Sequence, residues 1–340
     1  MGRRRGGFLI KGLTWSRIMR FSRLGIFALL TLTVLVSANC SQYNRIMSRK
    51  NLVDGSEAYK ARKFAVAEDL FRQAAARDPE GSTVEGRTAQ LFLARTLHSV
   101  YIGNRQQKEK ADEAIREYQK SLKVDKNDQS SYKAIASLLE NLQRPDEWQK
   151  LVTERANITD ILPQYRAEAL TALAVKQNNC ATEISDTEAT KKTVKVDGKD
   201  VFQFVKPADP AEFAKLQGCV AEGNKLIEQS VALEPEAVKN AKSVNIKSLS
   251  DEDLKKTNDL LNIFESARSY RASLVVQAMR LAEMEARTAD QTRLKTDADS
   301  AKAQYNELRD VNRNFQTEIE ARVAALTADA NANANANAAQ

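Results

Sequence analysis

Apolar residues recur every three or four positions through most of the chain beyond residue 44, with charged residues between them. This spacing places the apolar side chains on one face of a helix and predicts a succession of amphipathic helices. The expected helices form pairs at 55–74, at 91–101 with 111–123, at 132–142 with 146–156, and at 162–176 with a helix ending near 233. A longer helix, capped by Ser250, is expected to run from 251 toward 285, and a last one covers 301–326.

One segment has the period of a strand instead of a helix. Residues 193–205 alternate apolar and polar side chains on either side of Asp197-Gly198. This dipeptide is typical of the two-residue turn of a β-hairpin. We therefore expect a small β-hairpin in an insertion at 180–208, between the two helices of the fourth pair.

The first helical pair carries a pattern of small and large residues. Small residues stand where two helices would cross closely, at Gly55, Ala67 and Ala74, and large ones fill the space between them, at Tyr59, Phe64 and Phe71. A proline, Pro79, follows the second helix. This segment resembles the tetratricopeptide repeat (TPR) at nearly every signature position of that family.

The later pairs are in phase with the first, and the resemblance covers about residues 44–310. Ala114 matches Ala67 at a distance of 47 residues, so the intervening turn at 102–110 holds an insertion beyond the usual period of about 34. In the third pair Trp148 stands where a small residue is expected, which indicates a locally splayed pair of helices.

The resemblance implies an all-α fold. We expect a right-handed α-α superhelix of about five TPR-like hairpins, with a small β-hairpin insertion and a long C-terminal helix. The expected parts are a signal peptide or anchor at 1–39, repeats 1–3 at 41–158, repeat 4 at 159–235, a C-terminal helical pair at 251–327, and a disordered Asn-Ala tail at 328–340.

In the TPR family the first helices of the pairs line a concave face that holds an extended peptide or a helix of a partner protein. The repeat phase places seven residues on this groove: Arg49, Leu52, Ser56, Tyr59, Lys60, Arg95 and His98. The expected partners are therefore other proteins or peptides.

The last helical stretch carries its own apolar stripe, formed by Ala301, Tyr305, Leu308, Val311, Phe315, Ile319, Val323 and Leu326. Two interpretations fit it. The stripe covers the open end of the helical array, or it is a coiled-coil seam for self-association.

The N-terminus has the organisation of an export signal. Residues 24–38 form an uncharged, mostly apolar run that follows a basic stretch, and Cys40 follows this run after Asn39. The basic flank places the N-terminus in the cytoplasm and the rest of the chain in the cell envelope, outside the cytoplasmic membrane. The residues before Cys40 resemble the lipobox of bacterial lipoproteins, which predicts lipidation of Cys40; cleavage by ordinary signal peptidase and an uncleaved anchor are the alternatives. Met19 is an alternative start.

The net charge of +7 does not predict a nucleic-acid partner. Seven basic residues and no acidic ones precede Cys40, so the remainder of the chain holds 45 basic and 45 acidic residues. A neutral mature chain lacks the positive field that binds phosphate backbones.

Cys180 and Cys219 are the two cysteines beyond Cys40. Outside the cytoplasm such a pair is expected to form a structural disulfide. Two buried thiols, packed as small apolar residues, are the alternative.

No sequence motif of a phosphate-binding loop, a nucleophile elbow, a zinc protease or a dinucleotide turn is present, and His98 is the one histidine. We therefore expect no enzyme activity, no cofactor and no metal site. The sequence predicts a protein-binding scaffold of the bacterial envelope, in the periplasm or at the outer membrane, that supports a membrane-associated complex. The alternative is an accessory subunit that recruits a cell-wall or secretion enzyme.

Overall fold

The computed structural model describes residues 42–338, with side chains through residue 328. The apolar segment 24–38 and Cys40 lie outside the described residues. The chain forms two compact units, Met1–Leu138 and Leu139–Gln340, and the boundary between them falls within one helix. Among the residues that the structure describes, no helix is both long enough and apolar enough to cross a bilayer.

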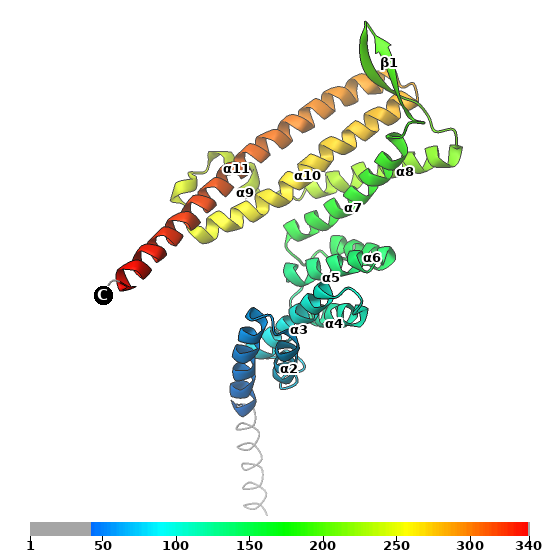
Figure 1. Ribbon diagram of the computed structural model, residues 1–340. Helices are drawn as coiled ribbons and strands as arrows, with labels where there is room; N and C mark the ends of the chain where they lie inside the picture. Colours follow the sequence, from blue (N-terminus) through cyan, green and yellow to red (C-terminus); the bar gives the residue numbers. More distant parts are fainter. Residues whose placement is uncertain (1–41, 339–340) are drawn as a thin grey trace, which may run out of the picture. The chain divides into compact units, whose positions relative to one another are not determined.

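Unit 1 consists of helical hairpins. A helix at residues 42–60 precedes α2 (Phe64–Ala75), α3 (Val84–Gly103) packs against both α2 and α4 (Lys108–Val124), and α5 (Gln129–Asn141) crosses the unit boundary (Figure 1). The helix expected at 91–101 begins earlier, because Thr83 caps α3 by accepting a hydrogen bond from the backbone N–H of Gly86.

Small residues allow the first hairpin of unit 1 to close tightly. Ala67, Ala74 and the large Phe71 of α2 are fully buried. A Cβ atom at Gly55 would lie 2.7 Å from the ring of Phe71, so the helix at 42–60 approaches α2 more closely than any side chain at position 55 would allow. The expected spacing of small and large residues therefore has a steric basis.

The turn between α2 and α3 is organised by Asp78. Its carboxylate accepts hydrogen bonds from the backbone N–H and hydroxyl groups of both Ser82 and Thr83. Partial burial opposes ionisation of this carboxyl, but these hydrogen bonds outweigh the burial and lower its pKa to about 2. Asp78 thus stays charged and fixes the start of the second hairpin.

Unit 2 contains the remaining elements. Its helices are α6 (Pro145–Asn157), α7 (Pro163–Ser185), α8 (Pro210–Val231), α9 (Glu236–Lys239), α10 (Asp251–Met284) and α11 (Thr288–Ala338), and its strands are β1 (Lys191–Val196) and β2 (Lys199–Phe204). Two short 3-10 turns, Ala241–Ser243 and Ile246–Ser248, connect α9 to α10. Ser250 caps α10 by accepting from the backbone N–H of Asp253, as expected.

The core of unit 2 lies where α10 packs against α7, α8 and α11. Its fully buried large residues are Ile227, Leu254, Leu261, Phe264, Leu274 and Phe315. Four of these residues, from Leu254 to Leu274, recur at helical spacing along α10, whereas Ile227 belongs to α8 and Phe315 to α11. Helix α10 is long because it contacts three other helices along its length.

Most of the apolar stripe on α11 packs against other helices of the same chain. Ala301, Leu308 and Phe315 are buried, and Val311 and Ile319 pack against the same core. Two residues at the end of the stripe remain exposed, Val323 and Leu326. The part of the stripe through Ile319 therefore covers the core of unit 2, as the first of the two interpretations proposes, and self-association through its end stays a prediction.

The Asn-Ala tail differs from the expectation of disorder at 328–340, because α11 continues as helix to Ala338. Alanine has the highest intrinsic helix propensity, and extending a formed helix requires no new nucleus. The tail therefore continues the helix that precedes it.

The expected β-hairpin is present between α7 and α8 (Figure 1). Its strands are antiparallel, with Val196 opposite Lys199 and Lys191 opposite Phe204. Asp197 and Gly198 both have positive φ, 51° and 77°, which is the conformation of a type I′ turn.

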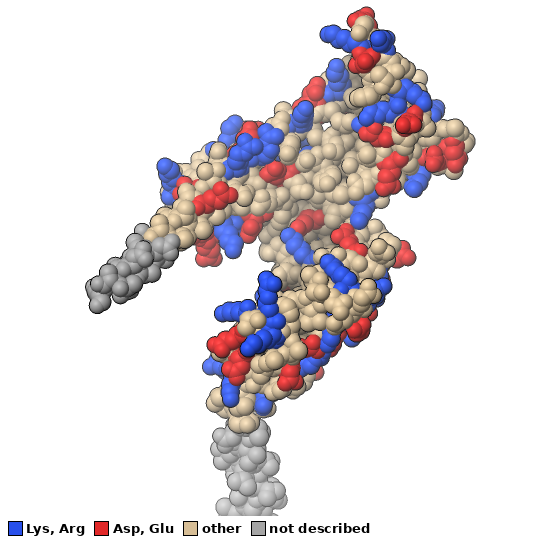
Figure 2. Space-filling view, in the orientation of Figure 1, with Lys and Arg blue, Asp and Glu red and all other residues tan. Residues whose placement is uncertain are grey.

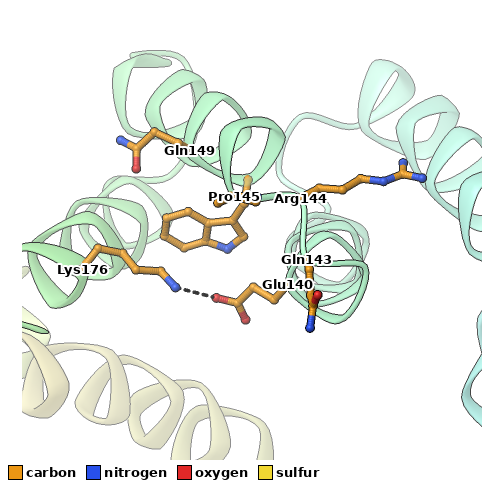
Figure 3. Close-up of a pocket in the computed structure, with 7 residues that line it drawn as sticks. Glu140, Gln143, Arg144, Pro145, Gln149 and Lys176 are labelled. Atoms are coloured by element: carbon orange, nitrogen blue, oxygen red, sulfur yellow. Dashed lines mark hydrogen bonds and ion pairs between the residues drawn. The ribbon is translucent and has the colours of Figure 1, made fainter. Parts of the chain in front are cut away.

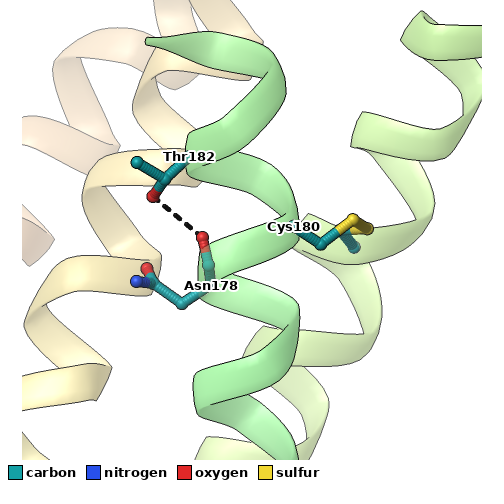
Figure 4. Close-up of a disulfide and its surroundings, with 4 residues drawn as sticks. Asn178, Cys180 and Thr182 are labelled. Carbon is teal, nitrogen blue, oxygen red and sulfur yellow. Dashed lines mark hydrogen bonds between the residues drawn. A yellow bond between two sulfur atoms is a disulfide. The ribbon is translucent and has the colours of Figure 1, made fainter. Parts of the chain in front are cut away.

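A disulfide joins Cys180 of α7 to Cys219 of α8, with 6.1 Å between the two Cα atoms (Figure 4). On α7, the hydroxyl of Thr182 donates to the backbone carbonyl of Asn178 at 2.8 Å, and it accepts from Gln277 of α10 at 2.8 Å. Helix α7 is thus tied to α8 covalently and to α10 by hydrogen bonds. The all-α class, the helical hairpins, the β-hairpin and the long C-terminal helix agree with the predicted fold.

Substitution of Gly55 by alanine is expected to destabilise unit 1 by about 1–3 kcal/mol, because the added methyl group overlaps the buried Phe71 ring. Gly103→Ala is the matched control, since a Cβ atom there meets nothing within 4 Å. Urea unfolding of both variants measures the change. Equal stabilities for the two variants would contradict the steric basis of the hairpin.

Candidate partner-binding site

The seven predicted groove residues lie on two helices of unit 1. Five of them, Arg49, Leu52, Ser56, Tyr59 and Lys60, belong to the helix at 42–60, and Arg95 and His98 belong to α3. The hydroxyl groups of Tyr59 and Ser99 are 2.9 Å apart and form a hydrogen bond that joins these two helices directly. The first helices of two successive hairpins therefore lie side by side, as the repeat requires.

The side chain of Arg49 is exposed, but its guanidinium is paired with a carboxylate of the same unit. Its Nε donates to Glu85 of α3 at 2.5 Å, and Arg45 donates to the same carboxylate oxygen at 3.0 Å. A backbone hydrogen bond, with these two guanidinium groups, lowers the pKa of Glu85 to about 2. This ion pair joins the two first helices and neutralises part of the cationic charge.

Ser56 and Leu52 contribute to the helix rather than to an open surface. The hydroxyl of Ser56 donates to the backbone carbonyl of Leu52 at 2.7 Å, one turn earlier, and both residues are half-buried. Neither side chain offers a free polar group at this position.

His98 faces the second helix of its own hairpin. Its ring lies edge-on to that of Tyr118 on α4, with 6.1 Å between ring centres and 3.5 Å between His98 Nδ1 and the tyrosine oxygen. Burial and the nearby positive charge of Arg105 both lower the pKa of His98. Burial likewise raises the pKa of Tyr118. At neutral pH this contact therefore joins two uncharged rings.

The cations that remain are Lys60, Arg95 and Arg105. The guanidinium of Arg95 lies 5.4 Å from the ring centre of Phe92, and that of Arg105 lies 5.0 Å from that of Tyr101. None of the three forms an ion pair with a carboxylate among the described residues. Stacking on a ring holds a guanidinium in place while its N–H groups stay open to an acceptor.

We call Tyr59, Lys60, Arg95 and Arg105 the cationic wall. Arg95 and Tyr59 both influence the pKa of Tyr118, and Arg105 influences that of His98, so these side chains lie around one buried aromatic contact. Arg105 was missed from the sequence because it lies in the inserted turn, where the repeat phase gives no position. In the sequence, the aromatic Tyr101 four positions earlier was the feature that could have identified Arg105.

Unit 2 contains a separate hollow beside Trp148, of about 350 Å³, between the turn from α5 to α6 and helix α7 (Figure 3). Its lining consists of Glu140, Gln143, Arg144, Pro145, Trp148, Gln149 and Lys176. Lys176 Nζ lies 4.7 Å from the centre of the indole ring and 3.3 Å from a carboxylate oxygen of Glu140. Trp148, which stands where a small residue was expected, thus forms the apolar floor of this hollow, and charged side chains lie at its rim.

No group of three His, Cys, Asp or Glu side chains that could hold a metal ion occurs within the described residues. The contacts of His98 place no nucleophile beside it, since its ring faces Tyr118. The described surface therefore offers binding groups, namely cations and aromatic rings.

No family model matches the chain, and no curated protein matches it. A solved structure titled "Functional Characterization of Pseudomonas Aeruginosa pilF" aligns with 81% of this chain and 99% of its own, at 14% identity and a TM-score of 0.31. At this score the assignment of the fold depends on the chain's own helices and their packing.

His98 should make the stability of unit 1 depend on pH between about 7 and 5. Its pKa is lowered in the folded state, so the unfolded chain binds a proton first, near its ordinary pKa of about 6.5, and stability falls as the pH falls. No other histidine titrates in this window, since the chain contains one. In His98→Gln the loss of hydrogen-exchange protection in α3 and α4 on acidification should be smaller. The same pH dependence in both proteins would contradict this assignment.

Proposed function

We propose that this chain is a protein-binding scaffold of the bacterial cell envelope, which supports the assembly or stability of a membrane-associated protein complex. The observation that carries the proposal is the cationic wall of unit 1. It joins the first helices of two successive hairpins, the surface on which repeats of this kind hold a partner.

The electrostatics of the wall favour a carboxylate ligand. Residues 42–138 contain 18 Lys and Arg against 13 Asp and Glu, and several of these charges neutralise each other in ion pairs, such as those of Glu68 with Arg72 and Lys110. Lys60, Arg95 and Arg105 are among the basic residues of this unit that form no ion pair with a carboxylate of the described residues. On the face shown in Figure 2, basic side chains lie among acidic ones in both units, so a partner would be recognised by local arrangement rather than by a uniform field.

Aromatic rings fix the positions of two of these positive charges. Arg95 and Arg105 each lie over a ring, and the Tyr59 hydroxyl is held by Ser99. A guanidinium fixed in this way loses little freedom when it forms a bidentate hydrogen bond with a carboxylate. The ligand that fits best is an acidic or carboxylate-ended peptide segment of a partner protein.

The proposed location depends on the segment before the described residues. The apolar run 24–38, with Cys40 two positions after its end, supports export and attachment of the chain to a membrane through lipidated Cys40. This attachment would hold the chain at a membrane surface, where its binding sites meet membrane-protein partners.

The double variant Lys60→Glu with Arg95→Glu should lose most of its partner capture, because it places two negative charges where carboxylates are proposed to bind. The measurement is crosslinking in native membranes followed by mass spectrometry. Lys108→Glu with Lys123→Glu is the matched control: it changes the charge equally in the same unit, at two exposed positions of α4. Lys60, Lys108 and Lys123 are exposed, where substitutions have small effects on stability, and Arg95 is half-buried, so urea unfolding of both variants accompanies the capture measurement. Recovery of the same partners by a folded Lys60/Arg95 variant would show that the binding surface lies elsewhere.

Cys40→Ala should release the protein into the soluble fraction and abolish its labelling with a radioactive fatty acid, because a thioether-linked lipid requires this sulfur. Fractionation and labelling of cells expressing either protein provide the measurement. A variant that remains in the membrane with an intact N-terminus would identify the apolar run as an uncleaved anchor instead.

A further inference from the structure

The β-hairpin of unit 2 is an unusual two-stranded sheet because it exposes large apolar side chains. Val196, Val201 and Phe202 are 51%, 39% and 61% exposed. The sheet has only two strands, so each strand has an outer edge along which no third strand pairs. Such an edge can accept an extended chain as an additional strand.

The turn determines which backbone groups point outward. In a hairpin with a two-residue turn, the residues that flank the turn, Val196 and Lys199, form a hydrogen-bonded pair, and bonded pairs then alternate with non-bonded ones along the strands. The hydrogen bond from Val205 N–H to Thr190 O fits this alternation. The N–H and C=O groups of Thr193 and Lys195 therefore point away from β2.

The two edges differ in what covers them. On β2, the outward N–H of Phe204 donates to Glu283 Oε1 of α10 at 3.1 Å, and the guanidinium of Arg280 lies 4.6 Å from the centre of the Phe204 ring. On β1, the outward backbone groups of Thr193 and Lys195 have no hydrogen-bond partner among the described residues. Helix α10 thus holds β2, and β1 carries the open edge.

We propose that the outer edge of β1 binds an extended segment of a partner protein in which acidic and apolar side chains alternate. A strand added there continues both faces of the hairpin. On one face its side chains would lie beside Lys191, Thr193 and Lys195. Lys191 is already paired with Asp186, at 2.7 Å, so the charge that favours acidic residues on this face is that of Lys195. On the other face they would lie beside Lys192, Val194 and Val196, where apolar residues extend the exposed patch.

The charge of β1 argues against a second copy of this chain on the same edge. Three of the six residues of β1 are lysines, so pairing of two such strands would place lysines beside lysines. The end of the hairpin argues against a lipid surface. Asp197, Lys199 and Asp200 lie at or beside the turn, and charged groups of this kind resist insertion into the apolar region of a membrane. This proposal is independent of the cationic wall, which lies in unit 1.

Three short capped peptides test the proposal against the full-length protein. The first alternates valine and glutamate, the second alternates valine and lysine, and the third is the first with N-methyl groups on alternate residues, which remove the hydrogen bonds of one edge. Fluorescence anisotropy gives the affinities. We expect binding of the first peptide only, with new hydrogen-exchange protection at the amides of Thr193 and Lys195.

Substitutions distinguish backbone pairing along the edge of β1 from other contacts between a peptide and the hairpin. Thr193→Pro removes an outward N–H of β1 and should lower the affinity for the valine–glutamate peptide by about tenfold or more. Asp200→Pro, the control on β2, removes the outward N–H of the residue that pairs with Lys195 and should leave the affinity within about twofold. Lys195→Glu keeps the backbone groups and should reverse the preference toward the valine–lysine peptide.

Several outcomes would overturn the proposal. They are the absence of binding to any of the peptides, equal binding of the N-methylated peptide, and a peptide preference that Lys195→Glu does not change. Vesicles containing anionic lipid provide the last comparison: binding to them in place of the peptides would assign the hairpin to a lipid surface.

Discussion

The ring of Phe71 connects the packing of the first helical hairpin to the proposed binding surface of unit 1. Gly55 leaves room for this ring between the helix at 42–60 and α2, because it has no Cβ atom. The ring then stacks on Phe92 of α3, with 5.4 Å between ring centres, and the guanidinium of Arg95 lies over this same Phe92 ring. A glycine in one helix thus determines where the next hairpin packs, and hence where a cation of the wall lies.

Charge pairing decides which basic residues of unit 1 are open to a ligand. Arg45 and Arg49 share Glu85, and Arg72 lies between Glu68 and Glu113. The pairs with Glu85 and Glu113 link different helices, so their removal would affect packing as well as charge, whereas Glu68 and Arg72 pair within α2. Arg95 and Arg105 lie against aromatic rings instead, where the guanidinium keeps its hydrogen-bonding edge. The arginines that form ion pairs are therefore different from the arginines that we propose bind a ligand.

In unit 2 the β-hairpin is attached to helices α7, α8 and α10, which are bonded to one another. Helix α7 is bonded to α8 through Cys180 and Cys219, and Gln277 of α10 hydrogen-bonds Thr182 and Ser185 on α7. The strands begin and end beside these helices, where Glu283 binds the backbone of Phe204. A two-stranded sheet has little stability by itself, so these contacts are what keep the exposed strands in register. The same contacts cover β2 and leave the edge of β1 open.

The sequence by itself determined the features that depend on local order. The 3.6-residue period predicted the helices, and the Asp197-Gly198 turn predicted the hairpin and its register, because both follow from backbone geometry within a few residues. The small residues of the first pair also predicted its close crossing, although the need for Gly55 in particular became clear only from the distance to Phe71.

The tertiary structure alone decided which side chains are free. Arg49 was expected to offer a free charge, yet its exposed guanidinium pairs with Glu85, 36 positions away, and His98 turns toward Tyr118 of its own hairpin. Arg105 joined the wall from a turn that the repeat phase could not place. The tail was expected to be disordered from its composition, and it extends α11 because the preceding helix supplies the nucleus. Periodicity assigns a residue to a face of a helix, whereas the pairing of its charge depends on helices that come together only when the chain folds.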